Sequence, residues 1–138
     1  GVHLAPEAVT LFARAAGAPR VALVSDALSP AGLAANSAAS WPVAGLGAVH
    51  REGERILTTH GTLAGGSTSA LDVLKSAVTA SHISLEHAVE MLTRTPARIA
   101  GAGKRKGLLA RGYDADVLLL KPDLSLAHVF VRGQEKRL

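Results

Sequence analysis

The sequence has 138 residues, of which 48% are hydrophobic and 19% are charged, so it can fill a core and is not intrinsically disordered. Fifteen basic against eleven acidic residues give a formal charge of +4, but four scattered aromatic residues are too few for a nucleic-acid stacking surface. The absence of cysteine excludes disulfides and thiolate metal sites. Neither a membrane-spanning apolar run nor a signal peptide is visible. We therefore expect a cytoplasmic protein without a nucleic-acid or membrane partner.

The first part of the chain predicts a helix followed by a buried strand. Pro6 suits the first turn of a helix, and apolar residues recur at helical spacing until Gly17, so we expect a helix over residues 6–16. Residues 21–24 (Val-Ala-Leu-Val) are apolar without alternation, which is typical of a parallel strand that is covered on both faces. This order is half of an α/β unit.

The middle of the chain predicts loops around a small hairpin. Residues 27–48 are rich in alanine, serine, proline and glycine and indicate a long loop. Residues 49–57 indicate a hairpin with Gly53 in its turn. Residues 61–68 indicate a glycine-rich loop that would bring backbone N–H groups to the start of the next helix.

Two helix starts follow. Ser69 and Asp72 have the spacing of a capping box, with an apolar helical face behind them. Ser84 is in the position of a second N-cap, and Pro96 interrupts the helix that it begins.

The last part of the chain changes to short apolar runs separated by glycines. Residues 117–120 and 129–131 predict strands of a separate small sheet. Asp114 and Asp116 lie in a turn that enters the first of these strands, and we expect a structural role for both, because aspartate commonly accepts backbone hydrogen bonds in turns.

Asp26 is the strongest candidate for chemistry. It directly follows the predicted buried strand, and ligands of α/β folds bind at the carboxyl ends of parallel strands. A carboxylate there can accept or donate a proton, although a helix or turn cap is an equally weighted alternative. The glycine-rich segment at residues 61–67 is the second candidate, for backbone contacts to a ligand, with a plain loop-to-helix connection as its alternative.

The six histidines do not predict a metal site within this chain. They include neither a His-x-His nor a His-Glu-x-x-His motif, and His82 and His87 are five residues apart, which does not place them on one helix face.

Several segments together resemble the amidohydrolase superfamily, in matching order and approximate spacing over nearly the whole chain. The strand that ends in Asp26, combined with the glycine-rich segment, is similar to its N-acetylglucosamine-6-phosphate deacetylase branch, whereas the last matching segment is shared by many amidohydrolases. The matching segments are residues 1–3 (Gly-Val-His), 21–27 (Val-Ala-Leu-Val-Ser-Asp-Ala), 30–32 (Pro-Ala-Gly), 61–65 (Gly-Thr-Leu-Ala-Gly), 93–97 (Thr-Arg-Thr-Pro-Ala) and 106–117 (Lys-Gly-Leu-Leu-Ala-Arg-Gly-Tyr-Asp-Ala-Asp-Val).

The resemblance implies an α/β fold, the C-terminal part of a (β/α)8 TIM barrel of the metal-dependent hydrolase type plus strands of a small β-sandwich. Residues 1–103 would belong to the barrel and residues 104–138 to the sandwich. Because a barrel alone takes about 250 residues, we expect the C-terminal portion of a longer enzyme, inactive without its missing N-terminal part.

The resemblance also implies an activity, hydrolysis of the acetamide of N-acetylglucosamine 6-phosphate to glucosamine 6-phosphate and acetate, in amino sugar catabolism. Asp26 would be the catalytic acid/base. A divalent metal, zinc or iron, would be held by ligands outside this chain, and the complete enzyme would be a homodimer acting on an amino sugar phosphate. The substrate-binding residues would be Gly1, Val2, His3, Leu63, Ala64 and Gly65.

Several departures from the family pattern leave the substrate open, among them an unusual loop at residues 36–47. Ser25 stands where threonine is common, and Gly66 adds a second glycine to the matching loop. The alternatives are another amidohydrolase (an N-acetylgalactosamine-6-phosphate deacetylase, a dipeptidase or a cyclic amide hydrolase) or a non-catalytic, stand-alone α/β binding module.

Overall fold

The computed structural model describes residues 2–33 and 40–137. The chain divides into two compact units, each built from two stretches of sequence. Unit 1 comprises Gly1–Leu11 and Leu23–Ile83, and unit 2 comprises Phe12–Ala22 and Ser84–Leu138. The division therefore falls within the first helix, and each unit is described by itself.

The predicted N-terminal helix is confirmed as α1 (Pro6–Ala16). Its proline lies at the first position, where a missing N–H costs nothing. Within unit 1, the Thr10 hydroxyl lies 2.9 Å from the carbonyl oxygen of Pro6 and 2.8 Å from that of Ser81. The second contact fixes the first half of α1 to the chain that follows α2 (Ala70–Thr79).

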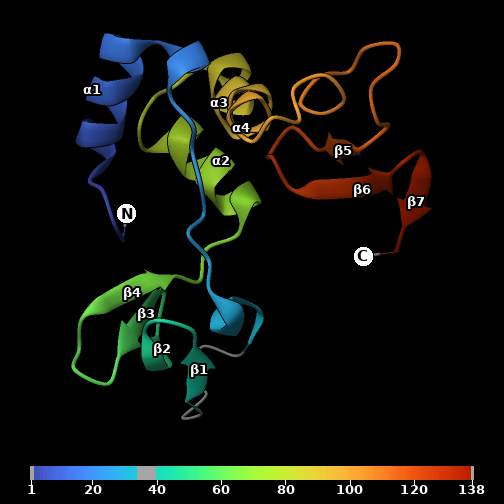
Figure 1. The fold of residues 1–138 in the computed structure, drawn as a ribbon. Coiled ribbons are helices and arrows are strands. Elements are labelled where there is room, and N and C mark those ends of the chain that lie inside the picture. Colours follow the sequence, from blue (N-terminus) through green and yellow to red (C-terminus); the bar gives the residue numbers. More distant parts are fainter. Residues whose placement is uncertain (1, 34–39, 138) are drawn as a thin grey trace. The chain divides into compact units, whose positions relative to one another are not determined.

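The prediction of a strand at residues 21–24 is wrong for the described chain. These residues follow η1 (Ala18–Arg20) without regular secondary structure (Figure 1). The Val24 side chain is exposed. Val21 has extended backbone angles, but a strand requires a hydrogen-bonded neighbour, and none of the described residues pairs with residues 21–24. The first backbone pairing comes at Ala27, which forms a single parallel bridge with Gly66.

Unit 1 is built around a four-stranded antiparallel sheet with strand order β1-β2-β3-β4 (Figure 1). The predicted hairpin is confirmed as β2 (Gly47–Glu52) and β3 (Arg55–Thr58). The prediction of one long loop over residues 27–48 is wrong, because this stretch contains η2 (Ser29–Gly32), all of β1 (Trp41–Val43) and the start of β2.

The prediction of a loop over residues 61–68 is wrong for its central part. Leu63–Gly66 forms β4, which pairs with β3 and places Gly65 opposite Ile56. Glycine has a low strand propensity, so tertiary packing decides this element. Val49 and Ile56, on the paired strands β2 and β3, are fully buried and form the centre of the sheet's packing.

The predicted capping box at the start of α2 is confirmed. The backbone N–H of Asp72 donates to the Ser69 hydroxyl oxygen at 3.1 Å, and that hydroxyl lies 2.6 Å from the Asp72 carboxylate. Removing such a cap typically costs about 1 kcal/mol of stability.

Unit 2 contains a helical cluster of η1, α3 (Leu85–Leu92) and α4 (Arg94–Ile99). Ser84 caps α3 as predicted, by accepting from the backbone N–H of His87 at 3.4 Å. The buried Thr95 hydroxyl donates to the carbonyl oxygen of Ala18 at 3.0 Å, which joins α4 to η1 across a long sequence separation.

A three-stranded antiparallel sheet with order β5-β6-β7 completes unit 2 (Figure 1). The two predicted strands are confirmed as β5 (Val117–Leu120) and β6 (Leu126–Val131), and β7 (Gln134–Lys136) adds a third that its polar sequence did not predict. In the described part of the chain, no helix has the length and apolar character needed to span a bilayer.

Candidate active site

The side chains of Asp26 and His3 lie close together within unit 1. The His3 Nε2 and the Asp26 Oδ2 lie 3.3 Å apart, although the two residues are far apart in the sequence. Both side chains remain accessible, with 36% of His3 and 57% of Asp26 exposed. A carboxylate in this position can exchange a proton with a bound molecule while the imidazole stays within reach of the same molecule.

The backbone of Asp26 is held by strand β4. The N–H of Gly66 donates to the carbonyl oxygen of Asp26 at 2.9 Å, and the N–H of Leu28 donates to the carbonyl oxygen of Gly66 at 3.2 Å. Asp26 has a φ of 49°, in the left-handed region that aspartate enters more readily than most residues. These two hydrogen bonds, on either side of the bridge between Ala27 and Gly66, therefore fix the backbone from which the Asp26 carboxylate extends.

The close approach of β4 to Asp26 requires a glycine at residue 65 and leaves little room for a side chain at residue 66. A Cβ at Gly65 would lie 2.8 Å from the carbonyl oxygen of Asp26 and 2.8 Å from the Leu28 side chain. A Cβ at Gly66 would lie 3.2 Å from the carbonyl oxygen of Ser25 and 3.5 Å from the His3 imidazole. At residue 65, only a residue without a side chain fits without displacing its neighbours, whereas at residue 66 a small shift of the Ser25 carbonyl would suffice.

The structure does not link the other predicted substrate-binding residues to Asp26 in the same way. Gly1 lies outside the described residues, and Val2 is half-buried. Leu63 and Ala64 lie at the start of β4, where Leu63 pairs with Leu57 and is exposed. The structure thus brings together Asp26, His3 and Gly65, and gives no contact from Leu63 or Ala64 to Asp26.

Gly66 lies in the glycine-rich candidate segment but was not among the individual substrate-binding residues expected from the sequence. In the sequence it is the second glycine after the Leu-Ala pair, a departure from the family pattern. A double glycine in a strand marks a place where another backbone approaches closely.

The described residues contain no group of three or more His, Asp, Glu or Cys side chains that could hold a metal ion. Asp26 and His3 provide only two such groups. The residues described here therefore do not make a complete metal site by themselves.

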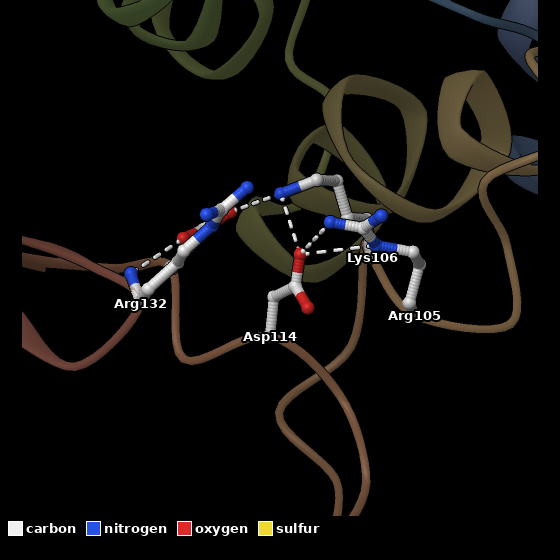
Figure 2. Close-up of polar contacts among 5 residues, drawn as sticks. Arg105, Lys106, Asp114 and Arg132 are labelled. Carbon is white, nitrogen blue, oxygen red and sulfur yellow. Dashed lines mark hydrogen bonds and ion pairs between the residues drawn. The ribbon is translucent and has the colours of Figure 1, made fainter.

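Asp114 and Asp116 belong to a separate ionic network in unit 2 (Figure 2). The Arg105 Nη2 and the Lys106 Nζ lie 2.8 Å and 2.9 Å from the Asp114 carboxylate, and Lys106 also pairs with Asp116. Hydrogen bonds from Arg105 and then Lys106 lower the pKa of Asp114 to about 2. A hydrogen bond from Lys106 and one from the Arg132 backbone lower the pKa of Asp116. These contacts agree with the structural role predicted for both carboxylates.

The sequence pattern of the amidohydrolase family matches residues 1–136, so the chain belongs to this family. Among its relatives, an N-acetylgalactosamine-6-phosphate deacetylase of Shewanella sp. is 32% identical over 97% of this chain and 33% of its own length. An N-acetylglucosamine-6-phosphate deacetylase of Danio rerio is 29% identical over 98% of this chain and 32% of its own length. The chain therefore spans about a third of the relatives it matches.

Solved structures of the same class share the fold. A variant of the Mycobacterium smegmatis N-acetyl-D-glucosamine-6-phosphate deacetylase, in complex with N-acetyl-D-glucosamine-6-phosphate, superposes with a TM-score of 0.86 at 25% identity. The likeness covers 98% of this chain and 35% of that one. It confirms the mixed α/β class that the sequence predicted.

Proposed function

We propose that this chain is the C-terminal part of an N-acetylglucosamine-6-phosphate deacetylase. The observation that carries the proposal is the Asp26–His3 pair held against Gly66, within a chain of the amidohydrolase family. The whole enzyme would hydrolyse the acetamide of N-acetylglucosamine 6-phosphate to glucosamine 6-phosphate and acetate.

In this proposal the complete fold is a (β/α)8 barrel with a small β-sandwich. Residues 1–103 belong to the barrel and residues 104–138 to the sandwich. Residues 21–24 become a barrel strand only when neighbouring strands from the rest of the enzyme pair with them. Val21 has extended backbone angles, and residues 21–24 have no strand partner among the described residues, which supports this.

Asp26 acts as general base and then as general acid. Its carboxylate accepts a proton from water as the water oxygen bonds to the acetamide carbonyl carbon. As the C–N bond breaks, Asp26 returns that proton to the departing nitrogen, and the products are a free amine and acetate. A positioned acid/base of this kind contributes about 10²- to 10⁴-fold to a rate.

His3 and the segment Leu63 to Gly65 position the substrate in this proposal, with His3 close enough to Asp26 to contact the same sugar. Gly1 and Val2 flank that histidine. The zinc or iron of the complete enzyme is held by residues outside this chain, and the enzyme is a cytoplasmic homodimer.

Deacetylation of N-acetylgalactosamine 6-phosphate is the second candidate. The Shewanella relative, an N-acetylgalactosamine-6-phosphate deacetylase, is 32% identical to this chain, whereas the Danio rerio N-acetylglucosamine-6-phosphate deacetylase is 29% identical. The two sugars differ at one hydroxyl configuration, which the contacts described here do not distinguish.

A substrate panel on the complete protein tests the proposal. Acetate release is measured with N-acetylglucosamine 6-phosphate, N-acetylgalactosamine 6-phosphate and unphosphorylated N-acetylglucosamine, and ring opening or peptide cleavage is measured with a cyclic amide and a dipeptide. We expect kcat/KM to be highest for N-acetylglucosamine 6-phosphate. A preference for the galactosamine isomer favours the second candidate, and turnover of only the cyclic amide or dipeptide overturns both.

A further inference from the structure

A pocket of about 490 Å³ lies in unit 2 at the turn between β6 and β7. This volume is within the usual range of small-molecule sites. The pocket is outside the catalytic proposal, which uses residues of unit 1 alone. Its lining consists of Lys106, Asp116, Val131, Arg132, Gln134 and Lys136.

The strands place three of these residues on one face. Val131 pairs with Gln134 across the β6–β7 turn, and paired residues of an antiparallel ladder project to the same side. Lys136 lies two residues beyond Gln134 and therefore shares that side. The Lys136 Nζ lies 3.5 Å from the Gln134 Oε1.

The network around Asp116 fixes the rest of the pocket. The Asp116 Oδ1 accepts from the backbone N–H of Arg132 at 2.8 Å, and the other carboxylate oxygen pairs with Lys106. The N–H of Gly133 donates to the carbonyl oxygen of Ala115 at 2.9 Å. The turn is thus anchored on both central residues before any ligand arrives.

The charges lining the pocket are unbalanced. The lining contains three cationic side chains (Lys106, Arg132 and Lys136) and one carboxylate (Asp116). Lys106 is already paired with Asp114 and Asp116. Within residues 2–33 and 40–137, no carboxylate forms an ion pair with the Arg132 guanidinium or the Lys136 ammonium group. Arg132 lies on the side of the network away from Arg105 (Figure 2).

Arg132 is held in an unfavourable backbone conformation. Its φ is 50° and that of Gly133 is 76°, so both central residues of this two-residue turn have positive φ, as type I′ turns require. Asparagine or glycine is preferred at the first position of such a turn, so arginine there costs stability and is better explained by its side chain than by the turn.

We propose that this pocket binds a phosphate group, either as inorganic phosphate or as a phosphomonoester. A dianion matches the surplus of two positive charges in the lining. The planar guanidinium of Arg132 suits two phosphate oxygens, Lys136 supplies a point charge, and Gln134 can donate its amide N–H. The site is independent of Asp26 and of the catalytic proposal.

The test follows backbone amide resonances of the complete protein by NMR during titration with inorganic phosphate or glycerol 1-phosphate. Local resonances are needed because a phosphate at the catalytic site would add to any global binding signal. We expect saturable shifts at the amides of Arg132, Gly133 and Gln134. Tighter binding of glycerol 1-phosphate indicates a phosphomonoester as ligand, and tighter binding of inorganic phosphate indicates the free ion.

Two variants separate binding from folding. Arg132→Asn removes the guanidinium but keeps the backbone N–H that Asp116 accepts, and asparagine suits positive φ, so the variant should melt no lower than the parent. We expect it to bind phosphate at least tenfold more weakly. Lys121→Gln removes one charge at the opposite end of β6 and should leave binding unchanged. Shifts that do not saturate, or equal weakening in both variants, overturn the proposal.

Discussion

The position of Asp26 depends on residues that carry no functional group. Gly66 is linked to Asp26 and Leu28 by two backbone hydrogen bonds, and Gly65 lies too close to both residues to carry a Cβ. The left-handed φ of Asp26 is kept in place by these contacts. The catalytic geometry that we propose is therefore determined by the approach of two backbones.

Gly65→Ala tests this dependence. The added Cβ would lie 2.8 Å from the Asp26 carbonyl oxygen, so the backbone at Asp26 must shift. We expect a loss of about 1–3 kcal/mol in the free energy of unfolding and a lower kcat, measured by denaturant unfolding and acetate release in the complete protein. Gly32→Ala is the matched control, because a Cβ there meets no atom of the described residues within 4 Å, and it should be near neutral in both measurements.

At the residue scale, the sequence identified Asp26 from its place after an apolar run, but His3 only from the family resemblance. Nothing in the local sequence around His3 indicates that it will lie 3.3 Å from Asp26, because that contact depends on tertiary structure. Gly65 was expected to bind substrate, and the structure adds its packing role against Asp26, which could be derived only from three-dimensional distances.

At the scale of elements, patterns with local causes were predictable and those that depend on a neighbour were not. The capping box at Ser69 and the hairpin of β2 and β3 have local signals, and both are present. Residues 21–24 have strand-like composition but no partner, whereas the glycine-rich residues 63–66 form a strand because β3 pairs with them.

The ionic network of unit 2 joins the segment at Arg105 and Lys106 to the turn that enters β5. Both cations lower the pKa of Asp114 from an ordinary value of 3.8 to about 2. The folded state therefore binds this proton less readily than the unfolded state, so the stabilisation is fully present above about pH 4 and is lost as the pH falls towards 2.

Asp114→Asn should reduce the dependence of the free energy of unfolding on pH between about pH 4 and pH 2. We expect the variant to be less stable than the parent at neutral pH, and the difference to shrink between pH 4 and pH 2, as measured by urea unfolding. Added salt should reduce the difference, because the groups are accessible to solvent. Glu54→Gln, which removes a carboxylate outside this network, is the control, and an equal pH dependence in both variants would contradict the assignment.

At the scale of the whole molecule, several large apolar side chains of the described residues are exposed to solvent. Leu109 is 80% exposed, Val24 and Ile99 are each 70% exposed, and Leu11 is 64% exposed. Large apolar side chains in such positions mark surfaces that pack against another part of a protein. If the chain is part of a longer deacetylase, as we propose, the rest of that enzyme would cover some of them.

The 138-residue chain in isolation should therefore be inactive. We expect no acetate release from N-acetylglucosamine 6-phosphate and no stoichiometric zinc or iron, because the described residues provide no three-ligand cluster. Metal analysis and an acetate assay on the purified chain test this. Stoichiometric metal together with turnover would show that the chain is catalytically complete.

The central claim is that Asp26 transfers the proton during amide hydrolysis, and Asp26→Asn in the complete protein tests it most directly. Asparagine keeps the shape of the side chain but cannot accept the proton. We predict that kcat for N-acetylglucosamine 6-phosphate falls by about 10²- to 10⁴-fold, while substrate affinity and metal content stay at the parent level. Near-normal turnover in this variant would contradict the account.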